Sequence, residues 1–284
     1  MRYVFMRYPG GKLKAVTFSY DDGVRQDLRF AEILDRYNLK GTFNINSGFL
    51  GLSNRITVEE IKEHILGKGH EVALHGKNHM APGAGFKPVF AITDILECRK
   101  ELEATFDMII RGMAYPDSGV KAMHNGNDYE TLRTLIESMG VVYSRTLGAD
   151  NDGFMLPSDF LSWMPTAHHG NPALFDMVKK FLEIDETRLY SSAMYPRLFY
   201  LWGHTYEFDK DDGWNLIEKF CSEISGKVDT WYATNIEIYD YVKAYNSLVT
   251  SADGRKIYNP TLKEIWLNID GKTLSVKSGE TINL

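Results

Sequence analysis

Residues 14–46 read KAVTFSYDDGVRQDLRFAEILDRYNLKGTFNIN, and this stretch decides the fold class. Its first part, residues 14–20, is rich in β-branched and aromatic side chains and predicts a strand. Residues 24–37 place apolar side chains at helical spacing, and residues 42–46 predict a second strand. Two strands joined by a helix in this way are expected to pair in parallel.

The same alternation of strands and helices continues to residue 248. With seven or eight strands, nearly all separated by a helix, the sequence predicts an α/β fold with a mostly parallel sheet and right-handed crossovers. Periodicity alone fits both an open doubly wound sheet and a closed barrel. The further strands are predicted at residues 71–75, 109–115, 141–145, 198–204 and 231–234, and the further helices at residues 57–67, 92–106, 128–139, 172–182, 214–224 and 236–248.

Residues 249–284 follow a different pattern. Residues 264–269 and 272–276 predict the two strands of a hairpin, and the Asp-Gly pair between them favours a two-residue turn. No helix is predicted in this tail. We therefore expect two domains, an α/β unit over residues 1–248 and a small β extension over residues 249–284.

The composition is typical of a globular protein and excludes several classes. Of the 284 residues, 44% are hydrophobic and 25% are charged, which argues against disorder and fibrous folds. Acidic residues outnumber basic ones by 38 to 32, so we expect no nucleic-acid partner. No apolar run has the length of a membrane span, and the N-terminus carries no apolar signal segment. The expected location is therefore the cytoplasm, with no membrane partner.

Residues suited to catalysis follow the ends of several predicted strands. Asp21 and Asp22 come after the first strand, His75 ends the third, and His204 ends a late one. In parallel α/β folds these strand ends share one rim, where active sites form. His79 lies four residues after His75, so both rings can converge on one ion together with Asp22. Three protein ligands and an open fourth position are typical of a catalytic divalent site, usually zinc.

A structural role is the alternative for each of these motifs. The segment DDG at residues 21–23 also suits a turn and a helix cap, and the two histidines can be surface residues. Either motif alone is common by chance. Both motifs at strand ends in one chain favour the metal site.

These residues carry a resemblance to a known family. TFSYDDG at residues 17–23 resembles the T-F-D-D-G motif of polysaccharide deacetylases of the NodB-homology family, carbohydrate esterase family 4. HGKNH at residues 75–79 resembles the family's H-[ST]-x-x-H motif, and LWGH at residues 201–204 is similar to its late leucine-and-histidine motif. The resemblance covers roughly residues 13–248 and implies a distorted (β/α) barrel of seven or eight strands.

The resemblance also implies a role for each residue. Asp21 corresponds to the general base, and Asp22, His75 and His79 correspond to the ligands of a divalent metal ion, with zinc expected. His204 corresponds to the general acid. The chemistry requires this division, because a metal ion polarises the acyl oxygen and acidifies a water, a carboxylate removes a proton, and an acid protonates the leaving group. The implied substrate is an acetylated carbohydrate.

The third motif of the family, R-x-P-Y-G, is altered here. The corresponding segment is GMAYPDSG at residues 112–119, with Ala114 in the place of the arginine. We expect Arg111 to replace that arginine beside Asp21. The alternative is that Arg111 is a surface charge flanking a strand.

The substrate site is expected to include residues from three segments. Tyr115, Pro116 and Asp117 come from the altered third motif, and the backbone N–H of Asp117 takes the position of the family's oxyanion donor. Trp202 shares its strand phase with the general-acid candidate two residues later, so both side chains face the same way. Trp163 is the third aromatic candidate for a sugar contact, and packing in the core is its alternative.

The fourth motif of the family, D-x-x-D-W, is not found. Residues 159–169 read DFLSWMPTAHH instead. The adjacent pair His168 and His169 is expected either to line the sugar site or to support His204. Ordinary loop positions are the alternative for both histidines.

Three functions are compatible with these features. The first is a metal-dependent hydrolase that removes acetyl groups from N- or O-acetylated carbohydrates. The second is hydrolysis of C–N bonds in small amides or cyclic ureides, because allantoinase-like relatives share the barrel. The third is a non-catalytic carbohydrate-binding protein on a decayed barrel, and the presence of every catalytic candidate argues against it.

Overall fold

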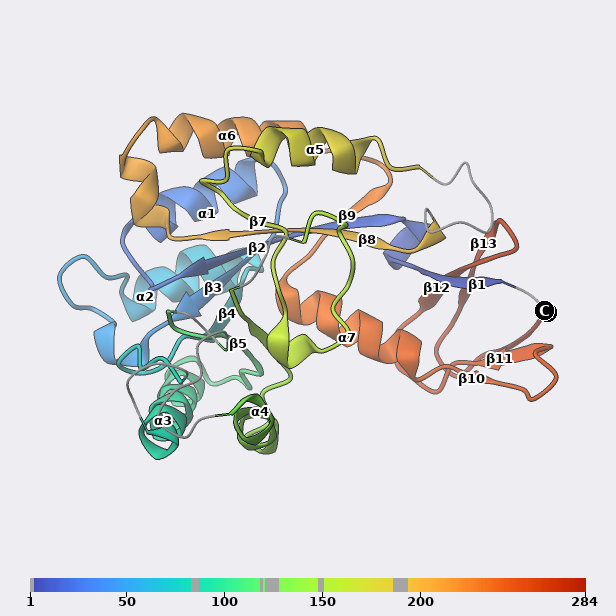
Figure 1. The fold of residues 1–284 in the computed structure, drawn as a ribbon, viewed down its shortest axis with the longest axis horizontal. Coiled ribbons are helices and arrows are strands. Elements are labelled where there is room, and N and C mark those ends of the chain that lie inside the picture. Colours follow the sequence, from blue (N-terminus) through green and yellow to red (C-terminus); the bar gives the residue numbers. More distant parts are fainter. Residues whose placement is uncertain (1–2, 83–86, 118–119, 121–127, 148–150, 186–193) are drawn as a thin grey trace.

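A parallel sheet forms the centre of the computed structural model (Figure 1), which describes residues 3–82, 87–117, 120, 128–147, 151–185 and 194–284. Its strands are β2 (Lys14–Asp21), β3 (Gly41–Ile45), β4 (Glu71–Leu74), β5 (Gly112–Ala114), β6 (Tyr143–Arg145), β7 (Ala167–His168), β8 (Arg197–Gly203) and β9 (Thr230–Tyr232). They are arranged in the order β6-β5-β4-β3-β2-β8-β7, and β9 also pairs with β2. Every pairing is parallel, as predicted. The sheet curls into a distorted (β/α) half-barrel, which confirms the expected fold class.

Helices cover the outside of this sheet. In Figure 1, α5 and α6 lie side by side above the strands, while α3 and α4 lie below them. The apolar face of α1 is buried through Phe30, Ile33 and Leu34, and the ring of Phe30 packs against Phe18 of β2. The helices are α1 (Gln26–Arg36), α2 (Val58–Glu60), α3 (Pro88–Phe106), α4 (Tyr129–Ser138), α5 (Leu174–Leu182), α6 (Gly213–Ile224) and α7 (Asn235–Asn246). No helix within the described ranges is long and apolar enough to cross a membrane.

The segment between β6 and β7 closes part of the gap between the two edges of the sheet. Trp163 forms a parallel bridge with Arg145 at the end of β6, and the backbone N–H of Trp163 donates to the carbonyl oxygen of Ser144 at 2.9 Å. Four residues later, Ala167 pairs with Leu201 of β8. The chain from residue 163 to residue 168 therefore joins the first strand of the order to the last.

A buried carboxyl group lies at the opposite end of the sheet from the predicted rim. Glu71, at the start of β4, accepts hydrogen bonds from the Tyr143 hydroxyl at 2.6 Å, the Thr42 hydroxyl at 2.8 Å and the Ile236 N–H at 2.9 Å. Burial outweighs these hydrogen bonds and raises the pKa of Glu71 from 4.5 to about 7. The folded state therefore binds a proton at Glu71 over a pH range in which the unfolded state has released it.

We expect Glu71→Gln to stabilise the protein more at pH 8 than at pH 5. Since the pKa is raised on folding, the wild type loses stability as pH rises from about 4.5 to about 7, by up to about 3 kcal/mol for a shift of this size. The neutral amide carries no such penalty. Urea unfolding at both pH values measures the difference, and Glu59→Gln on the exposed surface is the matched control. An equal effect of Glu71→Gln at both pH values would contradict the assignment.

Two small antiparallel sheets lie beside the barrel, at the right of Figure 1. One contains β1 (Val4–Arg7), β12 (Ile265–Ile269) and β13 (Lys272–Val276), and the other contains β10 (Val249–Thr250), β11 (Lys256–Tyr258) and β14 (Thr281–Asn283). The predicted hairpin is present, with Asp270 and Gly271 both at positive φ in its turn. The strand β1 was not predicted, and it pairs with β12. The domain boundary at residue 248 stays a prediction, since one of these sheets takes strands from both sides of it.

Candidate active site

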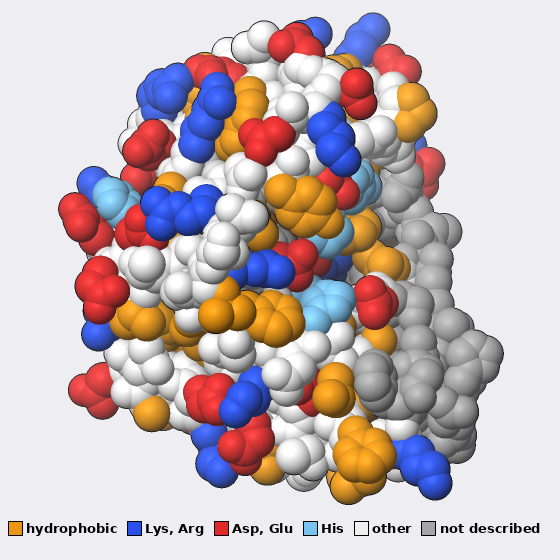
Figure 2. Space-filling model, turned by 90° about the vertical axis from the view of Figure 1, so that its left-hand side faces the viewer, with side chains coloured by type: hydrophobic (Ala, Val, Ile, Leu, Met, Phe, Trp, Pro, Cys, Tyr) orange, Lys and Arg blue, Asp and Glu red, His pale blue; other side chains and the backbone are white. Residues whose placement is uncertain are grey.

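A cavity of about 410 Å³ lies at the rim where the parallel strands end. Asp21, Asp22, His75, His79 and His204 all line it, as expected from their positions after strands. Figure 2 shows this face, with histidine, acidic, basic and hydrophobic side chains gathered near its middle. The predicted catalytic and metal-ligating residues, apart from Arg111, are therefore brought together.

Asp21 ends β2 and is almost fully buried. One carboxylate oxygen accepts a hydrogen bond from the side chain of Asn44 at 2.8 Å, and Asn44 is the register partner of Asp21 on β3. The other oxygen is paired with the guanidinium of Arg145. Burial raises the pKa of Asp21, but the charges of Arg145, His75 and His204 together lower it by more. The pKa of Asp21 therefore lies below its ordinary value. Asp21 is thus held as a carboxylate.

Asp22, His75 and His79 form a group suited to a divalent ion. The Nε2 atoms of His75 and His79 each lie 3.7 Å from Oδ1 of Asp22, and the three ligand atoms lie within 4.8 Å of one another. Nδ1 of His75 donates to the carbonyl oxygen of Ala114 at 2.9 Å, which leaves the lone pair on Nε2. That buried Nε2 has no hydrogen-bond partner among the described residues. An unpartnered lone pair facing a carboxylate and a second imidazole fits a metal ion.

The turn between the two histidines is shaped by Asp94 of α3. Its carboxylate accepts from the backbone N–H groups of Asn78 at 2.9 Å and Met80 at 3.3 Å. Gly76 adopts φ 74°, and a Cβ on it would lie 2.6 Å from the Asp94 carboxylate. His79 itself has φ 57°, in the left-handed region. Asp94 thus supports the close approach of the two rings, and the motif spacing alone does not reveal it.

His204 follows β8 and lies opposite the metal-ligand candidates. Its Nε2 is 3.9 Å from Oδ2 of Asp21, and its Nδ1 is 3.3 Å from Oε1 of Glu207. Burial lowers the pKa of His204, but the hydrogen bond with Glu207 and the charges of Asp21 and Asp22 outweigh burial and raise it. An elevated pKa keeps the proton that a general acid needs.

The prediction that Arg111 lies beside Asp21 is wrong. Arg111 precedes β5 and forms a two-pronged pair with Asp240 of α7, at 3.0 and 2.8 Å. It lies at the end where β5 begins, whereas Asp21 lies where β2 ends. The arginine beside Asp21 is Arg145, which is the register partner of Ala114 on the neighbouring strand. The guanidinium that the altered third motif lacks is therefore supplied at the same level from β6.

The substrate-site predictions have different outcomes. Trp163 is 1% exposed and packs against the rings of Tyr143, Phe160 and Tyr200, so the prediction that it lines the sugar site is wrong. Its backbone pairing with β6 directs it into the core. Three of the other predicted substrate-site residues line the cavity, namely Tyr115, Asp117 and Trp202. Pro116 is buried and does not line it.

The wall of the cavity includes a stacked pair. The guanidinium of Arg145 lies 4.3 Å from the ring centre of Trp202, which suits a cation–π contact. The hydroxyl of Tyr115 donates to the carbonyl oxygen of Leu161 at 2.9 Å. Trp202 is partly exposed in the cavity, so its ring remains available to a ligand.

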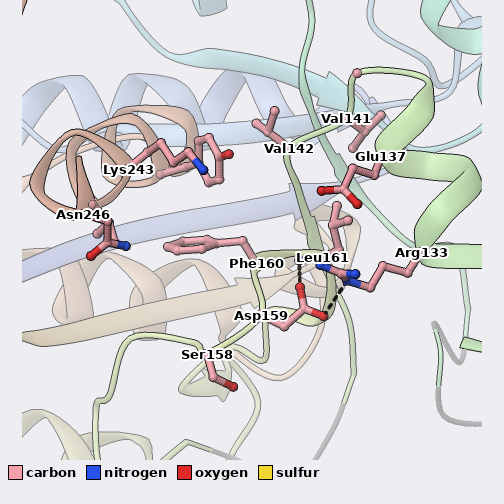
Figure 3. A pocket seen from close by; sticks show the side chains of 13 residues that line it. Arg133, Glu137, Val141, Val142, Ser158, Asp159, Phe160, Leu161, Lys243 and Asn246 are labelled. Atoms are coloured by element: carbon pink, nitrogen blue, oxygen red, sulfur yellow. Dashed lines mark hydrogen bonds and ion pairs between the residues drawn. The ribbon is translucent and has the colours of Figure 1, made fainter. Parts of the chain in front are cut away.

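A second cavity, of about 380 Å³, lies away from this rim (Figure 3). It is enclosed by α4, α7 and the segment around Phe160, near the residues that precede β6. The carboxylate of Asp159 there is 3.2 Å from Nε of Arg133 and accepts from the N–H of Leu161. None of the predicted site residues lines it, and it lacks the convergent histidines and carboxylates of the rim. The cavity at the strand ends is therefore the candidate active site.

Comparison with known proteins agrees with this assignment of the fold. Residues 4–140 match the polysaccharide deacetylase family model, a range that contains Asp21, Asp22, His75 and His79. A crystal structure from Mycobacterium smegmatis, assigned to the polysaccharide deacetylases, is similar at 19% identity and TM-score 0.57, over 87% of this chain and 96% of that one. One from Pseudomonas aeruginosa, with the same assignment, is similar at 14% identity and TM-score 0.58, over 82% of this chain and 92% of that one.

An allantoinase, Puue, has the same fold at 11% identity and TM-score 0.55, over 82% of this chain and 91% of its own. No curated protein matches the chain. At these identities the solved structures establish the fold alone. The chain is therefore similar to the polysaccharide deacetylase family in sequence over residues 4–140, and it shares the NodB-like half-barrel with the solved structures named above.

Proposed function

We propose that this protein is a metal-dependent hydrolase that removes acetyl groups from N- or O-acetylated carbohydrates. The observation that carries the proposal is the approach of the Asp21 carboxylate to the imidazole of His204, whose facing atoms are 3.9 Å apart. The pKa of Asp21 is lowered and that of His204 is raised, as a base and an acid require. Both lie beside three residues able to hold a divalent ion. A base and an acid at one metal site are the requirements for hydrolysing an amide or ester.

The chain's own residues divide the reaction between them. Asp21 accepts a proton from the attacking water, and Arg145 and Asn44 hold its carboxylate in place. His204 gives a proton from Nε2 to the departing nitrogen or oxygen of the sugar. An ion held by Asp22, His75 and His79 would polarise the acetyl carbonyl and lower the pKa of the attacking water.

The cavity suits a small polar ligand with an apolar face. Its volume of about 410 Å³ lies within the range of small-molecule sites. Trp202 and the half-exposed Tyr206 offer rings on which a sugar can stack. The backbone N–H of Asp117, a residue at φ 50° on the cavity wall, is a candidate donor to the acetyl oxygen.

Acetate release tests the function. Metal-loaded protein is incubated with N-acetylated chito-oligosaccharides, O-acetylated xylo-oligosaccharides and peptidoglycan fragments, and free acetate is measured. Release from at least one class supports the proposal. Release from none of them, together with hydrolysis of a cyclic ureide such as allantoin, would support C–N hydrolysis of small molecules instead.

We expect zinc or another divalent ion to bind in near-stoichiometric amount and His79→Ala to lose it. His79 supplies one of the three candidate ligands in this group, so its removal should lower metal affinity steeply. Elemental analysis of protein purified without chelator provides the measurement. His64→Ala, which removes a partly exposed histidine elsewhere, is the control. The metal assignment fails if His79→Ala and His64→Ala retain the same metal content.

A further inference from the structure

The carboxylate of Glu207 lies behind His204 and contacts three imidazole rings. Its Oε1 is 3.3 Å from Nδ1 of His204, and its Oε2 is 3.0 Å from Nε2 of His168 and 2.9 Å from Nε2 of His169. Glu207 belongs to the short 3-10 segment Thr205–Asp209 that follows His204. It does not line the cavity, so it can influence the reaction only through a neighbour.

The position of the ring hydrogen on His168 follows from a contact on its other nitrogen. Nδ1 of His168 accepts from the backbone N–H of Gly170 at 3.1 Å, so the proton of a neutral ring is on Nε2, facing Glu207. A metal ion at this cluster would need that same Nε2 lone pair. The arrangement therefore suits imidazole groups around a carboxylate better than ligands around an ion.

Glu207 is held as an anion. Burial raises the pKa of Glu207, but its contacts with His168, His169 and His204 lower it far below the ordinary range. A permanent acceptor beside Nδ1 of His204 favours the proton at that nitrogen. In the neutral ring, the lone pair is then on Nε2, which faces Asp21.

The segment that carries Glu207 is fixed independently of the histidines. The hydroxyl of Thr205 donates to Asp27 at 2.6 Å, and the side chain of Gln26 donates to Asp209 at 2.6 Å, so α1 holds both ends of the segment. Gly203 has no side chain, and a Cβ there would overlap the ring of His169. A change at Glu207 can therefore be made without releasing the segment.

We infer that Glu207 is a positioning residue that keeps the proton of neutral His204 on Nδ1, so that Nε2, which carries the second proton when the ring is protonated, faces the cavity. The expected kinetic effect rests on the proposed function, whereas the tautomer of His204 does not depend on it. The titratable groups that interact with His204 are Glu207 from its own segment, Asp21 and Asp22 from the end of β2, and His169, which follows β7. Of these, only Glu207 contacts Nδ1.

The test compares Glu207→Gln with Asp211→Asn, which makes the same change of carboxylate to amide at an exposed position shortly after the segment, away from the histidines and from the anchors of the segment. Histidine ¹⁵N NMR on protein with added Zn²⁺ reports the tautomer and pKa of each ring, and His204→Ala assigns the signal. In the wild type and in Asp211→Asn, neutral His204 should carry its proton on Nδ1. In Glu207→Gln, the Nε2–H form should become populated and the pKa should fall below the ordinary 6.5.

The kinetic arm uses an N-acetylated sugar and an activated acetate ester. Glu207→Gln should lower kcat on the sugar by at least about tenfold, with the alkaline limb of the pH profile moved to lower pH, and leave KM nearly unchanged. The activated ester needs no proton on its leaving group, so its rate should change little. An unchanged His204 tautomer and pKa in Glu207→Gln, or equal losses on both substrates, would overturn the inference. If the wild type releases no acetate from any sugar, the proposed function fails, while the NMR result still decides the tautomer.

Discussion

Replacing Asp21 by asparagine should lower the rate of acetate release by at least about a hundredfold, the lower range for a general base. Asparagine has nearly the same shape and can still accept from Asn44, but it cannot take up a proton from water. Initial rates on an acetylated oligosaccharide provide the measurement. Metal content should remain that of the wild type, since Asp21 is not among the three ligand candidates.

The same variant separates catalysis from a capping role. If Asp21 served only to shape the turn before α1, asparagine would serve almost as well. Asp107→Asn is the matched control, because Asp107 ends α3 in the left-handed region and is exposed. Asp107→Asn should leave the rate unchanged. Comparable turnover in Asp21→Asn and Asp107→Asn would remove the general-base assignment.

Arg145→Ala should reduce both stability and activity, and a second substitution should restore part of each. The change leaves the buried carboxylate of Asp21 without its charged partner, which typically costs about 3–5 kcal/mol. Ala114 lies at the same level on β5, so Ala114→Arg can return a guanidinium to the space that Arg145 vacates. Urea unfolding and acetate release should both show recovery in the double variant.

Arg111→Ala is the control for this series. Arg111 pairs with Asp240 at a partly exposed position, so its loss should cost about 1 kcal/mol or less and leave turnover unchanged. Equal effects of Arg145→Ala and Arg111→Ala would contradict the role given to Arg145. A double variant no better than Arg145→Ala would show that position 114 cannot replace position 145.

The rim residues could be predicted because each directly follows a strand with a clear apolar pattern. Asp21 and His75 needed only the strand bounds and the rule that parallel strands end on one side. Arg111 was assigned wrongly because it was placed by its distance from a motif. The strand predicted at residues 109–115 ends at the active-site rim after Tyr115. Arg111 lies near the start of that strand, away from the rim.

Arg145 and Glu207 depend on information that the linear sequence does not contain. Arg145 on β6 takes the place of an arginine that the family motif would put at position 114 on β5. The register that brings positions 114 and 145 to one level is set by the pairing of these strands. Glu207 is only three residues after His204, but its contact depends on a 3-10 segment and on two histidines from β7 and its end. The strand β1 was missed because it is only four residues long and its partner, β12, lies more than 250 residues later in the sequence.

The pairing of β1 with β12 has a consequence for the order of synthesis. The N–H of Tyr3 donates to the side chain of Asp270 at 3.1 Å, across 267 positions of sequence. As the chain leaves the ribosome, β1 emerges long before β12 and lacks this partner until residues 265–269 have followed. The entropy of closing so large a loop grows only with the logarithm of its length, so the equilibrium penalty is modest, but the delay is unavoidable. A ribosome that stops before residue 265 would release a chain whose first strand has an open edge, the kind of edge that pairs with other chains.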